Sequence, residues 1–297
     1  MEGQTKCTYV LSFVPNCSTK TWKSPDGTFT KKVLEPGSGL DKPRDGSQCC
    51  IFIDNSLKDA SSVEVNFPYT VNQWVNIILG ESDTECGVIL DKCLETMLRG
   101  EKSLVLVKHA TSLHPLSCNQ SEFTFAVHLA DFSQVKDSWE MSFEEKWDLI
   151  IKDKEKGSEN FKAGNIFGAC RRYGRALKYL VTLTHYVPAG MVKEYGEMMT
   201  VLYLNLAACQ IKLCQYGHVI QNCSKALELS PGNVKGLYRR GQAYTFRNEF
   251  EKAKDDLKNV LQLEPGNRAA CQQIKILENK IRAQDTKLAK AMSKLFS

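Results

Sequence analysis

The second half of the chain repeats its own pattern with a period of 34 residues. A self-alignment at this shift matches residues at positions that pack helices together, and both copies end in a proline. The matched pairs are Ala207 with Gly241, Gln210 with Tyr244, Val219 with Ala253, Cys223 with Leu257, Ala226 with Val260, and Pro231 with Pro265. A period of this length is typical of two-helix units that stack side by side, because no unit buries its apolar face alone. The repeat therefore predicts an all-α stack of helix pairs.

The period and the closing proline identify the units as tetratricopeptide repeats (TPR). An earlier copy begins near Ile150, and its corresponding residues are Gly157, Phe161, Ala169, Tyr173 and Ala176. About sixteen residues more than the period requires follow this copy, and we expect the excess, 180–199, to extend its second helix and turn. The predicted ranges are 136–149 for a linker and the start of the first helix, 150–267 for three TPR motifs, and 268–297 for a capping helix.

The first part of the chain has a different pattern, in which turn sequences separate short alternating segments. Strands are predicted at 49–53, 103–108 and 123–127, and a helix at about 86–98, which Gly100 is expected to stop. Such a pattern predicts a small antiparallel sheet with a helix packed on it, an α+β domain. The predicted fold is an N-terminal segment at 1–26, an α+β domain at 27–135, and then the all-α TPR superhelix.

Composition limits the function classes that need to be considered. The 297 residues are 42% hydrophobic and 25% charged, as in an ordinary globular protein, and no apolar run approaches a membrane span. The start lacks a basic segment followed by an apolar run, so we expect a cytoplasmic protein, with the nucleus as an additional location. The twelve cysteines show no paired Cys or His spacing, and we expect reduced thiols, no metal and no cofactor.

Charge is divided unevenly between the two regions. Residues 1–139 hold 13 basic and 17 acidic side chains, and residues 140–297 hold 26 and 17, which predicts an anionic partner for the second region. Nucleic acid fits this charge, but no zinc-finger or RNA-binding pattern accompanies it, so we expect no nucleic-acid or membrane partner. The basic, amphipathic stretch 287–296 suggests a calmodulin or membrane contact, and a solubilising cap is the preferred interpretation.

Four polar side chains occupy matching places in the predicted motifs. Lys154 lies in the first motif, Asn205 in the second, and Lys235 with Arg239 in the third. The first helices of stacked motifs line one concave surface, and residues four apart share a helix face. The set is suited to a polypeptide end with two carboxylates, each of which accepts charge-assisted hydrogen bonds.

The strings around these residues resemble a known family. KEKGSENF at 154–161, LNLAAC at 204–209 and KGLYRRG at 235–241 are similar to the TPR domains of the FKBP-type immunophilin co-chaperones, which hold the C-terminal Met-Glu-Glu-Val-Asp of heat shock protein 90. The resemblance implies a carboxylate clamp, with Ser158 at a position where related clamps often carry asparagine. The seventy-kilodalton chaperone ends in a similar sequence and is the alternative partner. The carboxylate-clamp residues are Lys154, Ser158, Asn205, Lys235 and Arg239.

The same family carries an FKBP domain before its TPR motifs, and residues 27–133 resemble one. Similar strings lie at 27–49, 92–107 and 123–132. Prolyl isomerisation in this fold needs an aromatic, water-poor pocket, and the resemblance implies that most of its residues are replaced. The degenerate pocket positions are Ile53, Val63, Glu64, Leu90 and Phe125, and the loop before the last strand is shortened to 109–120. We therefore expect an FKBP-like domain without isomerase activity.

Three functional hypotheses follow from these features. The first is a co-chaperone adaptor that links heat shock protein 90 to clients, for which the resemblance implies steroid receptors or cell-cycle regulators. The second is an active peptidyl-prolyl cis-trans isomerase, targeted to chaperone clients, that uses a divergent pocket. The third is a general peptide-binding or dimerising TPR protein. No other catalytic constellation is evident in the sequence.

Overall fold

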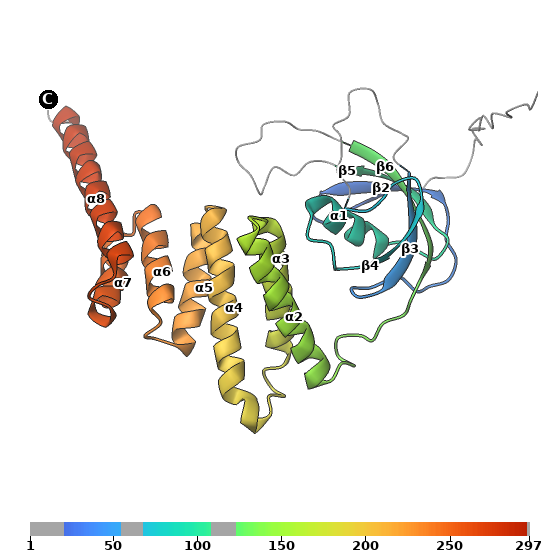
Figure 1. Cartoon of the computed structure of the whole chain (residues 1–297). Coiled ribbons are helices and arrows are strands. Elements are labelled where there is room, and N and C mark those ends of the chain that lie inside the picture. The colour runs from blue at the N-terminus through green and yellow to red at the C-terminus, as the bar shows by residue number, and fades with distance from the viewer. Residues whose placement is uncertain (1–20, 55–67, 108–122, 296–297) are drawn as a thin grey trace, which may run out of the picture. The chain divides into compact units, whose positions relative to one another are not determined.

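The computed structural model describes residues 21–54, 68–107 and 123–295. The predicted pocket positions Val63 and Glu64, and the loop 109–120, lie outside these residues. The chain forms two compact units, one made of Met1–Gly80 and Ile89–Gln134, and the other of Glu81–Val88 and Val135–Ser297. Figure 1 shows a sheet with a helix in the first unit and a succession of helices in the second.

A six-stranded antiparallel sheet forms the first unit, with strand order β1-β2-β5-β6-β3-β4. The strands are β1 (Thr21–Lys23), β2 (Phe29–Glu35), β3 (Gln48–Asp54), β4 (Trp74–Ile78), β5 (Lys102–Val107) and β6 (Phe123–Phe132). The helix is α1 (Glu85–Leu94), of which the part from Ile89 onward belongs to this unit. This confirms the predicted α+β fold. The sequence pattern predicted β3, β5 and β6 but not β1, β2 or β4. Of these, β1 and β4 are short and lack a regular alternation of buried and exposed residues.

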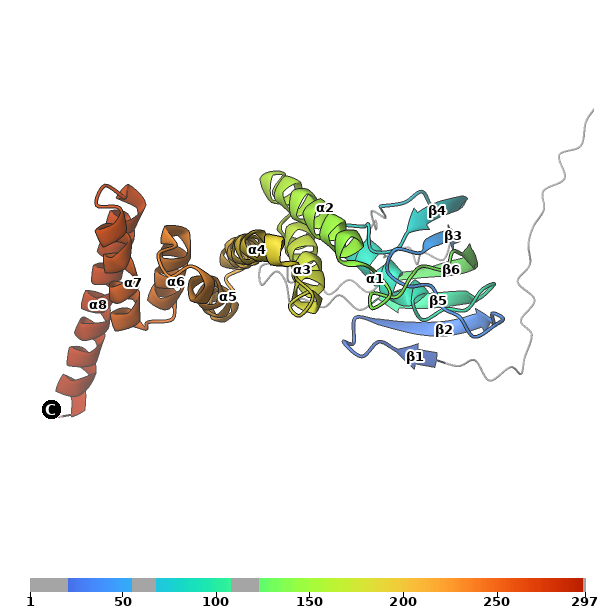
Figure 2. The ribbon, with the colours of Figure 1, turned by 90° about the horizontal axis from the view of Figure 1, so that it is seen from below.

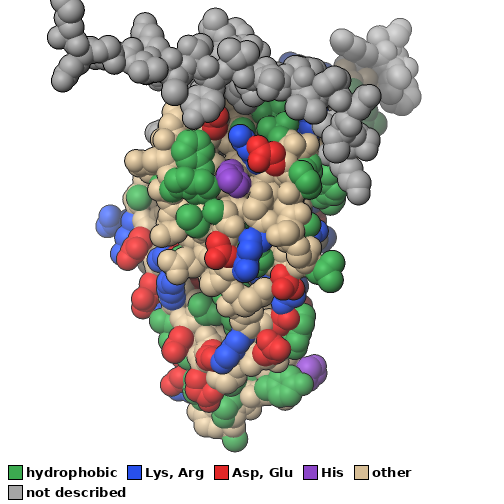
Figure 3. Space-filling model, turned by 90° about the vertical axis from the view of Figure 1, so that its right-hand side faces the viewer, with side chains coloured by type: hydrophobic (Ala, Val, Ile, Leu, Met, Phe, Trp, Pro, Cys, Tyr) green, Lys and Arg blue, Asp and Glu red, His purple; other side chains and the backbone are tan. Residues whose placement is uncertain are grey.

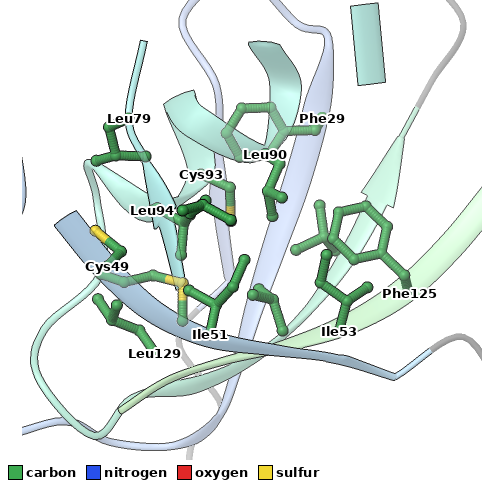
Figure 4. Close-up of a cluster of buried hydrophobic side chains, with 14 of the residues drawn as sticks. Phe29, Cys49, Ile51, Ile53, Leu79, Leu90, Cys93, Leu94, Phe125 and Leu129 are labelled. Carbon is green, nitrogen blue, oxygen red and sulfur yellow. The ribbon is translucent and has the colours of Figure 1, made fainter. Parts of the chain in front are cut away.

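Alternation along the strands places one apolar row in a core between sheet and helix. On β3, Cys49, Ile51 and Ile53 are fully buried, and Leu90 and Leu94 of α1 belong to the same cluster. Figure 4 shows these side chains pointing toward one another from the helix and the strands. Burial of each such aliphatic side chain is worth about 1.5–3 kcal/mol, so this cluster holds the unit together.

The helix of the first unit ends earlier than predicted. It ends at Leu94 instead of at residue 98, and the hydroxyl of Thr96 donates to the carbonyl of Cys93 at 2.7 Å. A threonine that bonds to nearby backbone in this way competes with continuation of a helix. Gly100, at φ +78°, lies in the turn into β5, where its N–H donates to the carbonyl of Leu129. The glycine therefore serves the strand connection and is not the helix stop.

Seven α-helices follow one another through the described part of the second unit. They are α2 (Phe143–Lys162), α3 (Ile166–Thr182), α4 (Val192–Lys212), α5 (Tyr216–Leu229), α6 (Val234–Phe246), α7 (Phe250–Leu263) and α8 (Arg268–Leu295). Each packs on the next in chain order, as Figures 1 and 2 show. The predicted all-α TPR stack is therefore confirmed. None of the helices among the described residues is long and apolar enough to cross a membrane.

Local signals define where these helices begin and turn. Ser142 forms a capping box with Glu145 at the start of α2, which satisfies two backbone donors that the helix leaves open. The turn inside each motif contains one residue with positive φ, namely Gly164, Cys214 or Asn248. Cys214 and Asn248 are separated by the 34-residue period. The repeat therefore extends to backbone conformation, even where the residue type is unfavourable for it.

The excess residues of the first motif are placed differently from the prediction. The second helix of that motif, α3, has 17 residues, against 14 in α5 and in α7. Most of the excess forms the connection that contains the short 3₁₀ helix η1 (Ala189–Met191) and lengthens α4, which has 21 residues against 13 in α6. The expectation that the excess extends the second helix and its turn was therefore only partly correct, because a helix pattern alone does not say which neighbour is lengthened.

Gly157 provides a test of the close approach between the first two helices. A Cβ atom there would lie 2.7 Å from Cε1 of Tyr173, whose hydroxyl is held at 3.1 Å from Oγ of Ser158. We expect Gly157→Ala to lower the free energy of unfolding by about 1–3 kcal/mol, measured by urea titration of the helical circular dichroism signal. The control is Gly174→Ala in α3, where a Cβ meets nothing within 4 Å. This variant should raise stability by up to about 1 kcal/mol, since alanine is the better helix former. Equal effects at the two glycines would contradict the packing described.

Candidate functional site

The residues predicted as a carboxylate clamp lie on the first helices of three successive motifs. Lys154 and Ser158 are on α2, Asn205 is on α4, and Lys235 and Arg239 are on α6. These helices are brought together by packing, since α4 contacts both α5 and α6, and α3 joins α2 to α4. The period thus places polar groups that are distant in the sequence on neighbouring helices.

Arg239 is a partly buried cation whose one side-chain hydrogen bond to the described residues goes to a backbone oxygen. Its Nη1 donates to the carbonyl of Leu204 at 2.7 Å, and no carboxylate among the described residues pairs with it. Burial lowers the pKa of the Arg239 guanidinium, which shows that the charged form lacks compensation. A guanidinium has five N–H donors, so most of its binding capacity is unused. An uncompensated cation of this kind is costly to the fold and favours an anionic ligand.

The neighbouring arginine is in the opposite situation. Arg240 donates from Nε and Nη2 to the two carboxylate oxygens of Asp256, each at 2.8 Å, and from Nη1 to Oγ of Ser224 at 3.1 Å. The hydrogen bonds to Asp256 raise the pKa of Arg240. Arg240 therefore joins α6 to α7, whereas Arg239 retains its donors. Of these two adjacent arginines, Arg240 forms a structural ion pair and Arg239 does not pair with a described carboxylate.

The two clamp lysines also lack partners in the described part of the chain. The ammonium groups of Lys154 and Lys235 form no ion pair or hydrogen bond with a described residue. By contrast, Lys152 and Lys156, on either side of Lys154, both pair with Glu81. Burial would raise the pKa of Glu81, but hydrogen bonds from these lysines and the charge of Arg172 lower it to about 2. The three lysines of this turn thus divide into two with structural partners and one without.

Ser158 does not simply take the place of an asparagine. Its hydroxyl donates to the carbonyl of Lys154 at 2.9 Å and lies 3.1 Å from the hydroxyl of Tyr173. Burial raises the pKa of Tyr173, and the tyrosine is close enough to Arg239 for the two to interact electrostatically. Ser158 and Tyr173 therefore form a polar contact that joins α2 to α3, within the electrostatic range of Arg239 on α6. Sequence reasoning treated Tyr173 only as a packing residue, and no pattern in the chain indicates its polar contact.

The predicted isomerase-pocket positions that the structure describes are part of the core of the first unit. Ile53 and Leu90 are 0% exposed and Phe125 is 1% exposed, and all belong to one hydrophobic cluster. Figure 4 shows the three side chains surrounded by other apolar residues. Among the described residues there is also no group of three or more His, Cys, Asp or Glu side chains arranged to hold a metal ion. The polar chemistry of the second unit is therefore the better candidate site.

The two arginines of α6 give a direct test of this assignment. We expect Arg240→Met to lower the free energy of unfolding by about 3 kcal/mol, because Asp256, 4% exposed, would lose its partner in a buried place. The matched variant Arg239→Met should change stability by no more than about 1 kcal/mol, and in the stabilising direction, since it removes an uncompensated charge. Urea unfolding measures both. A large destabilisation by Arg239→Met would assign this side chain to the fold instead of to a ligand.

Comparison with known proteins adds independent information. Residues 22–134 match the family description "BDBT FKBP like N-terminal". Over 282 residues the chain is 36% identical to a Mus musculus protein named FK506-binding protein-like, with 93% of this chain and 73% of the mouse protein covered. It is 32% identical over 278 residues to the Bos taurus protein named peptidyl-prolyl cis-trans isomerase FKBP4, covering 91% of this chain and 59% of that protein. A crystal structure of residues 1–211 of CG17282 matches with a TM-score of 0.53 at 20% identity, over 68% of this chain and 97% of that one, which supports the fold alone.

Proposed function

The chain belongs to the family of FK506-binding protein-like proteins, and from this premise we propose that it is a co-chaperone adaptor. In this proposal the TPR motifs hold the acidic C-terminus of a chaperone, and the sheet domain contacts client proteins without catalysing prolyl isomerisation. Clients such as steroid receptors or cell-cycle regulators remain part of the proposal through family resemblance.

The observation that carries the proposal is the unused hydrogen-bonding capacity of Arg239. This partly buried cation has a lowered pKa and, among the described residues, its side chain is hydrogen-bonded to the carbonyl of Leu204 alone, so an incoming carboxylate would stabilise it. Lys235 lies one helical turn earlier on α6, so the two cations share a face. Lys154 and Asn205 add a further cation and an amide from α2 and α4.

A free polypeptide C-terminus that ends in aspartate matches this set of groups. It offers two carboxylates close together, the terminal one and that of the side chain, and each charge-assisted hydrogen bond is worth about 1.5–3 kcal/mol. Family resemblance favours Met-Glu-Glu-Val-Asp of heat shock protein 90 as this end, and the similar end of the seventy-kilodalton chaperone is the alternative. A clamp that reads the chain end requires a free carboxylate in either case.

Calorimetric titration with the free-acid peptide Met-Glu-Glu-Val-Asp tests the clamp. We expect binding with a Kd of about 1 μM, equivalent to about 8 kcal/mol. The C-terminally amidated peptide should bind the original protein about 100-fold more weakly or worse. The free-acid peptide should lose as much affinity for the double variant Lys235→Ala, Arg239→Ala, because either change removes charge-assisted hydrogen bonds.

The matched control for this experiment is Lys258→Ala, which removes an exposed lysine on α7, the second helix of its motif. The affinity of this variant for the free-acid peptide should equal that of the original protein. Equal binding of the amidated and free-acid peptides would show that the chain end is not read, and would leave a general peptide-binding TPR protein. Parallel titration with the free-acid end of the seventy-kilodalton chaperone distinguishes the two chaperone partners.

The proposed lack of isomerase activity rests on the apolar core of the sheet domain. Ile53 and Leu90 stand at positions where family resemblance implies a tyrosine and the tryptophan of the pocket floor, and both are fully buried. An aliphatic side chain supplies no aromatic face for a proline ring. The alternative remains an isomerase that uses a divergent pocket, in keeping with the name of the bovine relative.

A protease-coupled peptide assay distinguishes these two alternatives. We expect a kcat/KM at least about tenfold below that of an active single-domain FK506-binding protein measured in parallel, a loss of more than about 1.4 kcal/mol of transition-state stabilisation. FK506 at saturating concentration should leave the melting temperature of this protein unchanged and raise that of the active control. A rate within tenfold of the control would establish the enzyme alternative.

A further inference from the structure

A row of side chains crosses the outer face of the sheet in the first unit. Strand register pairs Glu35 with Lys102, Lys102 with His128, His128 with Phe52, and Phe52 with Trp74. The row thus runs over β2, β5, β6, β3 and β4. On β3, Phe52 lies between the buried Ile51 and Ile53, so it and its partners in the register face away from the core.

Three aromatic rings are grouped at one end of this row. The ring centroids of Phe52 and Trp74 are 5.5 Å apart with the planes at 58°, and those of Trp74 and His128 are 5.1 Å apart at 60°. Trp74 is 51% exposed. Figure 3 shows hydrophobic side chains gathered beside a histidine on this side of the molecule, with acidic and basic side chains near them. An aromatic group left half in water is a common anchor for binding partners.

Beside these rings the surface is hollowed. The hollow has a volume of about 230 Å³ and is lined by Phe52, Asp54, Trp74, Lys102, Ala126, Val127 and His128. Among its lining residues, Ala126, which pairs with Asp54 in the strand register, has the smallest side chain. The volume is below that of pockets for drug-sized molecules, about 300–1,000 Å³, and is suited to a single side chain.

The charges around the hollow favour a cation as its occupant. Lys102 lines the hollow, and its ammonium group lies 3.7 Å from a carboxylate oxygen of Glu35, so this exposed pair offsets part of its charge. Asp54 also lines the hollow, and because a carboxylate accepts about four hydrogen bonds, it has capacity for a ligand in addition to its interaction within the protein. The faces of aromatic rings attract cations as well. Ring faces and a carboxylate together are complementary to a basic side chain.

We propose that this hollow binds an arginine side chain of a partner polypeptide, with the guanidinium plane against the rings of Trp74 and Phe52 and its N–H groups directed to Asp54. Arginine is favoured over lysine because its planar guanidinium stacks on aromatic rings and is weakly hydrated. The site lies on the opposite face of the sheet from the core that holds Ile53 and Phe125. It is therefore distinct from the core positions at which the isomerase pocket was predicted.

The test is a titration of the full chain, followed by amide and indole NMR signals, with N-acetyl-arginine amide as the probe. The signals of the Trp74 indole and of the Ala126 and His128 amides should shift and saturate in the millimolar range. N-acetyl-citrulline amide, which has nearly the same shape and no charge, should bind at least about tenfold more weakly. This comparison needs no variant and therefore does not depend on the folding of a mutant.

Variants locate the site within the surface. Asp54→Asn should weaken arginine binding about tenfold, and Trp74→Ala should abolish the saturable shifts at Ala126 and His128. Ile78→Ala removes another half-exposed apolar side chain of β4 away from the hollow, and should leave the affinity unchanged. Equal binding of citrulline, or the absence of saturable shifts at these residues, would overturn the proposal.

Discussion

Burial of one helix pair by the next is the constraint on which the second unit depends. A TPR motif has apolar residues on both faces that meet its neighbours, so each interface is stable only when the adjacent motif is present. The contacts are close: Gly157 touches the ring of Tyr173, and Gly241 lies against Leu257. Leu277 of α8 closes the series by covering Ala253 and Leu257 of the last motif. The polar side chains of α2, α4 and α6 are placed as a consequence of this packing.

The same packing determines which charges have partners. An ion pair between arginine and aspartate joins the two helices of a motif twice: Arg240 of α6 pairs with Asp256 of α7, and Arg172 of α3 pairs with Asp153 of α2. Both aspartates are buried, and removal of one partner would leave a buried charge without compensation. Lys154, Lys235 and Arg239, which make no ion pair with a described residue, stand on first helices. These three cations therefore remain available to bind a ligand, because no ion pair within the described structure occupies them.

Periodicity made much of the second unit predictable from sequence. The 34-residue shift identified Ala207 and Gly241 as close-packing positions, and the structure confirms that both are buried. The residues 180–199 break the period, and for this reason their division between α3, the connection and α4 was not predictable. The string KGLYRRG did not reveal which arginine pairs with Asp256, because that depends on where α7 lies. In the first unit, β4 and the row from Glu35 to Trp74 depend on strand register, which local patterns do not specify.

The order of contacts along the second unit also affects how it loses structure. In a stack where each motif touches only its neighbours, fraying begins at an end and moves inward one interface at a time. A ligand that contacts α2, α4 and α6 together would span three motifs and connect them to one another. Its binding energy would then be shared by interfaces that are otherwise independent, so the bound protein would melt more cooperatively than the free one. Ligand binding would therefore make the unfolding transition steeper as well as shift its midpoint.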